Sequence, residues 1–439
     1  MKKLLLSLSV VLFCASLTAQ EFDRAKMDSL FSLIDENGKG MYSVAIFQDG
    51  KEVYSNAIGY ADREQQIAAT PETRYRIGSI SKTFTAVLVM QLVEQGKLSL
   101  DTRLSEFYPK IPNAEKITIE HLLRHRSGIY NFTIDPEYAD YMEEPISKKK
   151  LVKIISKYDS DFEPGAKYSY SNSGYVLLSF IIEELSGKSY ADLLQQSICT
   201  PCTFENTYFG GKIDPGKKEA RSYEFANGWK ASTETDMSVP QGAGALVSTP
   251  RDLNRFFNCL FDYKLVNEES IAKMTDLRDN YGFGLFEFPF YSKKAIGHNG
   301  GIDGFVSSAG YFPEEKTSVA LITNGTLVGM NDVMIGVLSI YFGKEYNLPK
   351  FKPSVPISSE ALDAYTGTYS SPDFPLKIKI RNKDGAPYGQ ATGQSEFPLE
   401  YIGEDQFQFL QADLVLKFDP KAGKMTLRQG GGSYVLTKE

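Results

Sequence analysis

Histidine is scarce in this sequence, with only three among 439 residues. His121 and His125 lie four residues apart, a spacing that can hold zinc on a helix. The segment between them, His-Leu-Leu-Arg-His, lacks the glutamate of the H-E-x-x-H motif of metalloproteases. We therefore expect no metal and no other cofactor.

Long apolar runs are also scarce. Two lysines precede the one clear run, at residues 4–17, and Ala19 then offers a small residue for cleavage. This pattern is typical of a secretory signal peptide, here residues 1–20. A membrane anchor is the alternative, and lipidation of Cys14 is disfavoured because bulky Phe13 precedes it. No later run reaches the roughly 18 apolar residues of a membrane helix, so we expect secretion across the inner membrane into the periplasm.

Cysteines are few, and removal of the signal peptide would leave Cys199, Cys202 and Cys259. An odd number in an oxidising compartment allows one disulfide and one free thiol, and the spacing leaves the pairing open. The Cys199-Thr-Pro-Cys202 segment imitates a redox C-x-x-C motif but lacks the surrounding βαβ pattern of thioredoxins. We expect a structural disulfide or buried thiols.

Basic residues do not predominate: 48 Lys and Arg face 55 Asp and Glu, a formal net charge of −7. An acidic chain without a basic patch argues against a nucleic-acid partner. The expected partner is a small-molecule or peptide substrate, and the sequence leaves the oligomeric state open. The G-x-S-x-G elbow is also missing, so an α/β-hydrolase fold has no support.

The order of predicted elements indicates an α+β fold. Residues 41–60 predict a β-hairpin around Asp49-Gly50, and short strand-like runs return between residues 282 and 323. Helices are predicted between them, at residues 79–95, 117–126 and 176–185. Strands early and late with helices between them favour one sheet shared by the first and last strands.

The chain changes character near residue 345. Three prolines fall within eight residues of the segment 344–358, and the runs that follow, such as LKIKI and LVLKF, are all strand-like. We therefore expect a main domain at residues 21–345, a linker at 346–359 and a small antiparallel β-domain at 360–439.

The first chemical motif is Ser79-Ile-Ser-Lys82, at the start of a helix that is apolar on nearly all sides. Residues three apart share one helix face, and the helix N-terminus favours developing negative charge. Burial lowers the pKa of a lysine, so Lys82 can serve as a neutral base for the Ser79 hydroxyl. A second S-x-x-K, from Ser147 to Lys150, lies in a lysine run that is typical of a solvated face.

Two further motifs follow along the chain. Tyr170 and Asn172 form a Y-x-N triplet before a predicted helix, where a phenol near a lysine can relay protons and an amide can hold a substrate carbonyl. The run 297–301, Gly-His-Asn-Gly-Gly, lies in a strand-like region, where glycines let a ligand approach the backbone. His298 can donate to a substrate or orient the phenol.

Together these motifs resemble the serine β-lactamase and penicillin-binding protein superfamily, most closely its class C β-lactamase-like branch, which includes D-stereospecific peptidases and esterases. The resemblance spans about residues 40–330 and is carried by the segments RIGSISKTFTA, ITIEHLLRHRSGI, FEPGAKYSYSNSGY and GHNGGIDGFVSSAGYFPEEKTSVALITN. Residues 360–439, opened by Tyr365-Thr-Gly-Thr-Tyr369, are similar to the lipocalin-like β-domain of some members.

The resemblance implies an antiparallel sheet flanked by helices beside a mostly helical subdomain, with the site between them. It implies Ser79 as the nucleophile that forms an acyl-enzyme, and Lys82 and Tyr170 as the proton shuttle. It implies that Asn172 contacts substrate and lysine, and that the backbone amides of Ser79 and Gly301 form the oxyanion hole. The histidines at 121 and 125 fall in a segment that is structural in such proteins.

The third motif departs from the penicillin-targeting members, which usually carry Lys-Thr-Gly where this chain has His298-Asn299-Gly300. A cation that would hold a substrate carboxylate is replaced by a mostly neutral imidazole. This favours an ester, or a peptide or amide, over a β-lactam. The expected substrate contacts are Asn172, His298, Gly300 and Gly301, with walls from residues 130–145, including Tyr130 and Asn131, and from residues 206–240.

Two alternatives remain open. One is a D-Ala-D-Ala carboxypeptidase or a true β-lactamase with the same nucleophile. The other, of a different class, is a non-catalytic protein that binds penicillin or cell-wall fragments, which would form at most one covalent adduct per chain.

Overall fold

The computed structural model describes residues 22–439, so the expected signal peptide at residues 1–20, including Cys14, lies outside the described residues. Within this described part, no helix is long and apolar enough to cross a membrane.

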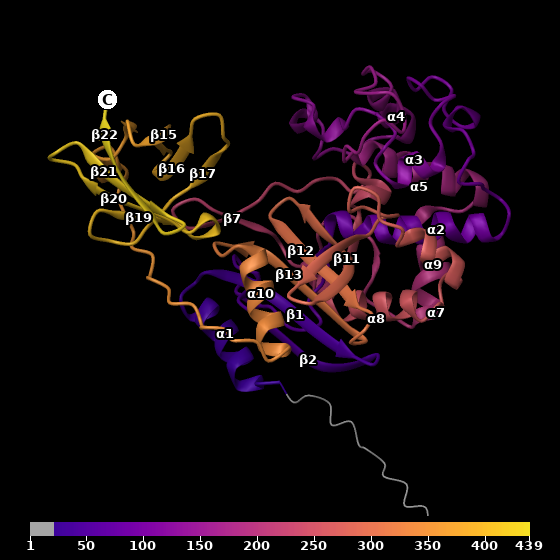
Figure 1. Cartoon of the computed structure of the whole chain (residues 1–439), viewed down its shortest axis with the longest axis horizontal. Helices are drawn as coiled ribbons and strands as arrows, with labels where there is room; N and C mark the ends of the chain where they lie inside the picture. The colour runs from indigo at the N-terminus through magenta and orange to yellow at the C-terminus, as the bar shows by residue number, and fades with distance from the viewer. Residues whose placement is uncertain (1–21) are drawn as a thin grey trace, which may run out of the picture.

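A six-stranded antiparallel sheet forms the centre of the main domain (Figure 1). Its strands, in spatial order, are β10 (Phe286–Phe290), β11 (Lys293–Ile302), β12 (Phe305–Phe312), β13 (Thr317–Thr326), β1 (Gly40–Gln48) and β2 (Lys51–Ile58). β1 pairs with β13 along its whole length, which confirms that the first and last strands share one sheet. Asp49 and Gly50 both have positive φ, as the tight turn of the predicted hairpin requires.

Helices cover both faces of this sheet. α1 (Arg24–Glu36) and α10 (Met330–Tyr341) pack together on one face, and α8 (Pro250–Phe261) packs on the other. Alternation along the strands divides the core accordingly: Val319 and Leu321 of β13 join the α1/α10 side, whereas Ala320 and Ile322 join the side of α8.

The helical subdomain lies beyond the α8 side of the sheet, at one end of the molecule in Figure 1. Its main helices are α2 (Ser81–Glu94), preceded by a 3₁₀ turn at Gly78–Ile80, and α5 (Asn172–Ser186), which ends where Gly187 adopts a left-handed conformation. The shorter helices are α3 (Ile119–Leu123), α4 (Lys148–Ile155), α6 (Tyr190–Leu194), α7 (Thr200–Cys202) and α9 (Glu268–Met274). The remaining short strands of the main domain are β3 (Tyr60–Asp62), β4 (Ile67–Ala68), β5 (Tyr75–Arg76), β6 (Tyr208–Phe209), β7 (Tyr223–Phe225), β8 (Trp229–Ala231) and β9 (Leu246–Ser248), and β7 contacts β13 of the central sheet.

α3 is shorter than the helix predicted at residues 117–126. Thr118 caps its N-terminus by accepting a hydrogen bond from the His121 amide. The helix ends early because His125 adopts a left-handed backbone conformation with φ of 54°, which no α-helix can continue.

The C-terminal region is a nine-stranded antiparallel sheet with a hydrophobic core of its own. Its strands are β14 (Gly367–Ser371), β15 (Phe374–Lys383), β16 (Ala386–Ala391), β17 (Glu396–Pro398), β18 (Glu400–Tyr401), β19 (Gln406–Phe409), β20 (Leu414–Asp419), β21 (Lys424–Gln429) and β22 (Gly432–Lys438), preceded by the short helix α11 (Ser359–Leu362). The two outermost strands are β17 and β18, which are neighbours in sequence, so the sheet is a nearly closed barrel. This confirms the all-β prediction, while the exact domain limits stay a prediction.

A buried ion pair joins the C-terminal barrel to the main domain. Lys39, in the turn before β1, binds Glu400 of β18, and both side chains are almost fully buried. Glu400 also accepts hydrogen bonds from Ser354, in the segment between the two parts, and from Gln408 of β19. The Glu400 carboxylate therefore binds a cation of the main domain and hydrogen-bond donors of the connecting segment and the barrel where these two parts are in contact.

The structure resolves the cysteine pairing that the spacing left open. Cys202 and Cys259 form a disulfide that ties α7 to α8, and Cys199 is a buried free thiol. Burial raises the pKa of Cys199 to about 12, so the thiol stays protonated and does not react as a nucleophile.

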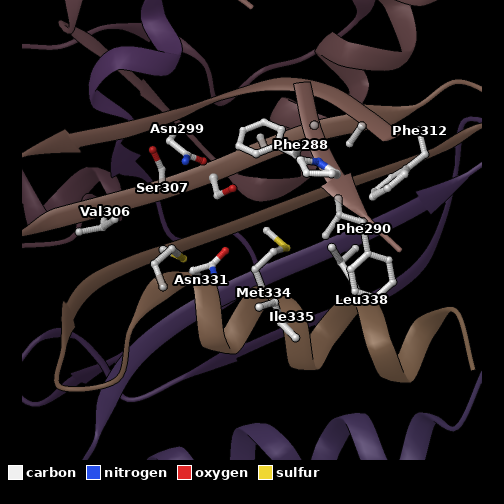
Figure 2. Close-up of a pocket in the computed structure, with 17 residues that line it drawn as sticks. Phe288, Phe290, Asn299, Val306, Ser307, Phe312, Asn331, Met334, Ile335 and Leu338 are labelled. Carbon is white, nitrogen blue, oxygen red and sulfur yellow. The ribbon is translucent and has the colours of Figure 1, made fainter. Parts of the chain in front are cut away.

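A largely apolar pocket of about 510 Å³ lies between α10 and strands β10 to β12 (Figure 2). Phe288, Phe290, Met334 and Leu338 supply much of its wall, and Asn299 of β11 reaches its edge. Because side chains alternate along a strand, Gly300 faces the opposite side, toward the helical subdomain.

Candidate active site

Glycine lets strand β11 approach the turn that carries Ser79. A Cβ added to Gly300 would lie 2.0 Å from the Ile77 carbonyl oxygen, and one added to Gly78 would lie 2.7 Å from the Gly301 amide nitrogen. Gly78 also has a positive φ of 50°. The serine turn and β11 are therefore in backbone contact, which only glycine at both positions permits.

The segment 298–302 of β11 has a free edge beside this turn. β10 pairs with β11 only as far as Gly297, whereas β12 pairs with it through Ile302. The 3₁₀ turn at Gly78–Ile80 packs against β11 where β10 has ended. A substrate carbonyl placed here can reach backbone amides, as an oxyanion hole requires.

Lys82 is completely buried in the first turn of α2 and has three hydrogen-bond acceptors. Its Nζ lies 2.9 Å from Ser79 Oγ, 2.8 Å from Asn172 Oδ1 and 2.7 Å from the Ala243 carbonyl oxygen. Burial without a carboxylate partner lowers the pKa of Lys82 well below its ordinary 10.5.

The partners of Lys82 are compatible with a neutral amine, which its lowered pKa favours. Asn172 Oδ1 and the Ala243 carbonyl can only accept, so they use the two N–H groups of a neutral amine. When the amine is neutral, its lone pair is left for the Ser79 hydroxyl at 2.9 Å; when it is protonated, its third N–H donates to Ser79 Oγ. This arrangement can remove the serine proton.

Tyr170 lies on the other side of the serine. The Ser79 side chain is near enough to the Tyr170 phenol to lower the phenol's pKa in part, and Lys82 Nζ lies 4.9 Å from the ring centroid. Burial raises the pKa of Tyr170 above its usual value, so it rests as a neutral phenol that can donate a proton.

Asn172 begins α5 and is held on both sides. Besides accepting from Lys82, its amide donates to Thr133 Oγ1 at 3.0 Å, and its backbone N–H donates to Asn131 Oδ1 at 3.0 Å. The Tyr130 carbonyl accepts from Ser173 Oγ in the same helix turn. The two residues expected to touch substrate, Tyr130 and Asn131, therefore also support the start of α5.

His298 lies in the site, but both of its ring nitrogens are bonded within the chain. Nδ1 donates to the Asn299 carbonyl, and Nε2 accepts from the Tyr281 hydroxyl at 3.0 Å. Burial lowers the pKa of His298 to about 3. The ring is therefore neutral, as the sequence suggested, and a substrate contact through either nitrogen would require one of these bonds to exchange.

Arg76 anchors the wall segment 206–240 to the sheet. It is buried and donates to Asp303 Oδ2 at 2.8 Å and to Glu234 Oε1 at 3.1 Å. Asp303, in the turn after β11, also accepts from the Thr235 amide and hydroxyl. The wall is therefore held by a charged network two residues from Gly301.

Sequence reasoning missed several members of this site. Tyr281 is one of 26 tyrosines and follows no motif, and Ala243 contributes a backbone oxygen that no side chain reveals. Arg76 begins the segment RIGSISKTFTA, but no pattern in the sequence predicted its ion pairs with Glu234 and Asp303. The second S-x-x-K lies on an exposed face, as expected, and Ser147 also caps α4 by accepting from the Lys150 amide.

The two histidines considered for zinc are used otherwise. His121 accepts from the Thr118 amide through Nδ1, and His125 lies under the ring of Tyr170. Among residues 22–439, no group of three or more His, Cys, Asp and Glu side chains is arranged to hold a metal ion.

Known proteins share this architecture. The teichoic acid D-alanine hydrolase of Staphylococcus aureus is 29% identical over 324 residues, which are 72% of this chain and 75% of the relative. The D-amino acid amidase of Ochrobactrum anthropi SV3, solved with L-phenylalanine amide, is 28% identical with a TM-score of 0.64, covering 73% of this chain and 99% of that one.

A third similar protein extends over the C-terminal barrel. The octameric penicillin-binding protein homologue of Pyrococcus abyssi is 27% identical with a TM-score of 0.65, covering 94% of this chain and 100% of its own. The model of the family described as Beta-lactamase matches residues 29–334. With this match over more than half of its length, the chain belongs to the β-lactamase family and is a serine hydrolase.

Proposed function

We propose that this protein hydrolyses the amide or ester bond of a D-aminoacyl substrate through an acyl-enzyme on Ser79. The observation that carries the proposal is the fully buried Lys82, whose Nζ lies 2.9 Å from Ser79 Oγ and whose pKa burial lowers well below 10.5. The D-aminoacyl preference is supported by the relatives, one named for D-alanine hydrolysis and one for D-amino acid amides.

Acylation begins with proton transfer from Ser79 Oγ to Lys82 Nζ while Oγ attacks the substrate carbonyl carbon. The carbonyl oxygen becomes an oxyanion held by the backbone N–H groups of Ser79 and Gly301. Loss of one such donor typically costs about 10²- to 10³-fold in kcat.

Collapse of the tetrahedral intermediate requires a proton on the leaving nitrogen or oxygen. Tyr170 donates its phenolic proton to the leaving group and recovers one from the Lys82 ammonium, so the pair is reset. In deacylation, water gives a proton to Lys82 as it attacks the acyl carbon, and Tyr170 returns a proton to Ser79 Oγ as the acid leaves.

The carboxylate-binding cation of penicillin-targeting enzymes has no equivalent at His298, since the ring is neutral and already bonded. A substrate that relies on a terminal carboxylate is therefore disfavoured. This supports aminoacyl amides and esters over D-Ala-D-Ala peptides and β-lactams.

Turnover of matched substrates tests the proposal. D-alanine and L-alanine p-nitroanilides, an activated D-alanyl ester and a penicillin are each incubated with the protein and with Ser79→Ala. We expect turnover of the D-alanyl compounds that is lost in the variant. A lasting penicillin adduct without turnover would favour the non-catalytic binding protein, and rapid penicillin loss would favour a lactamase.

We also propose that the protein is exported to the periplasm and matures by cleavage after Ala19, within the signal-peptide segment at residues 1–20. The Cys202–Cys259 disulfide supports this, because such bonds persist in oxidising compartments. N-terminal sequencing of the exported protein tests it: a mature chain starting after Ala19 is expected, and an intact Met1 would contradict it.

The domain division is proposed as main domain 21–345, linker 346–359 and β-domain 360–439. The separate core of the C-terminal barrel and the lack of helix or strand between residues 343 and 358 support it. Truncation after residue 350 should leave a folded, protease-resistant main domain. A truncated chain that does not fold would make the barrel an integral part of the main domain.

A further inference from the structure

His125 holds the backbone on both sides of Tyr170. Its carbonyl oxygen accepts from the Ser169 amide at 2.9 Å, and its ring Nδ1 accepts from the Ser171 amide at 3.1 Å. Between these two bonds, its imidazole lies against the Tyr170 ring, with centroids 4.1 Å apart and planes inclined by 35°. One residue therefore restrains the phenol from two backbone positions and one ring face.

This arrangement is unfavourable for His125 itself. Its φ of 54° is in the left-handed region, which costs a non-glycine residue stability. Because Nδ1 accepts, the neutral ring carries its proton on Nε2, and that nitrogen is buried with no partner among the described residues. Local strain together with an unpaired buried donor is more often found at functional sites than in ordinary packing.

We propose that His125 is a positioning residue that fixes the Tyr170 phenol against Ser79; this rests on the proposed role of Tyr170 as proton donor. The aromatic surroundings complete the restraint, since the His125 ring also contacts Tyr175 and Tyr281, at centroid distances of 5.1 and 4.7 Å. His125 itself stays neutral, because burial lowers its pKa well below the ordinary 6.5.

Two substitutions separate the parts of this restraint. His125→Asn tolerates the left-handed backbone and keeps an oxygen acceptor for the Ser171 amide, but removes the ring that supports Tyr170. His125→Phe keeps a ring and removes the acceptor. His121→Asn is the matched control, because His121 lies in the same segment and its ring and backbone amide form hydrogen bonds with Thr118 at the start of α3.

We expect each His125 variant to lose about 10²-fold in kcat with little change in KM, because small misplacements of a catalytic group cost about that much. The control should keep its kcat even where its melting temperature falls. Thermal unfolding identifies folded variants, and His125→Phe carries the test if His125→Asn does not fold.

The decisive comparison adds Tyr170→Phe to each variant. If His125 acts through the phenol, the double variant has the same kcat as Tyr170→Phe alone, because the group being positioned is already gone. An equal fold-loss in both backgrounds would overturn the proposal and leave the proton donor in place. If Tyr170→Phe alone leaves kcat unchanged, the proton-donor role itself fails, and the positioning role with it.

Discussion

Lys82 Nζ lies 2.9 Å from Ser79 Oγ, and its two remaining partners, Asn172 Oδ1 and the Ala243 carbonyl oxygen, can only accept hydrogen bonds. No carboxylate lies among these three partners to stabilise a positive charge. The buried amine is therefore prepared to receive the serine proton, and its own pKa decides when it can.

The first prediction concerns pH. Burial lowers the pKa of Lys82 well below 10.5 and raises that of Tyr170 above 10.0. Because Lys82 must be neutral and Tyr170 protonated, kcat/KM should rise as pH rises through the lowered Lys82 pKa and then stay level to about pH 10. A pH profile with a non-ionising ester measures this; a midpoint of the rise near 10.5 would contradict a neutral resting lysine.

The second prediction concerns the phenol. Tyr170→Phe should lower kcat by about 10²- to 10⁴-fold, the usual value of a general acid, while KM changes little. Tyr168→Phe is the control, because Tyr168 lies two residues before Tyr170 and its ring packs near Tyr281, with the ring centroids 5.8 Å apart. Steady-state kinetics of both variants give the comparison; an unchanged kcat in Tyr170→Phe rejects the proton-donor role.

The third prediction concerns backbone contact between β11 and the serine turn. In Gly300→Ala the new methyl would lie 2.0 Å from the Ile77 carbonyl oxygen, so β11 or the turn must move. We expect a loss of at least about 10²-fold in kcat from this displacement. Gly211→Ala is the control, since a methyl there meets no atom within 4 Å. Equal kcat in the two variants would show that the close contact is not needed for catalysis.

The fourth prediction concerns stability. Removing one partner of a buried ion pair leaves the other as an unpaired buried charge. Glu400→Gln leaves Lys39 in that state, so it should lower the free energy of unfolding by about 3–5 kcal/mol. Glu163→Gln breaks the exposed pair with Lys116 and should cost less than about 1 kcal/mol. Denaturant unfolding of both variants compares them, and similar losses would mean that the Lys39 site opens to water.

The sequence predicted the local geometry of the site better than its distant contacts. Ser79 and Lys82 are one helical turn apart, so their proximity follows from helix geometry alone. Asn172 is ninety residues further along, and only the resemblance of its motif placed it beside Lys82.

Other contacts could not be read from sequence, for physical reasons. Tyr281 bonds His298 because two chain segments come together in the fold, and neither segment has a sequence pattern that predicts contact with the other. The left-handed conformation of His125 shortened α3 and brought its ring under Tyr170, although histidine has no marked preference for that conformation over a helical one. The fold class followed from the order of strands and helices, because that order depends on local periodicity.

The most direct test of the central claim is rapid-quench mass spectrometry of the protein mixed with an activated D-alanyl ester. We predict a burst of leaving group matching the enzyme concentration and a transient D-alanyl adduct that maps to the peptide containing Ser79. Ser79→Ala should show neither adduct nor turnover. Turnover retained in Ser79→Ala, or an adduct on any other residue, would contradict the assignment of Ser79 as the nucleophile.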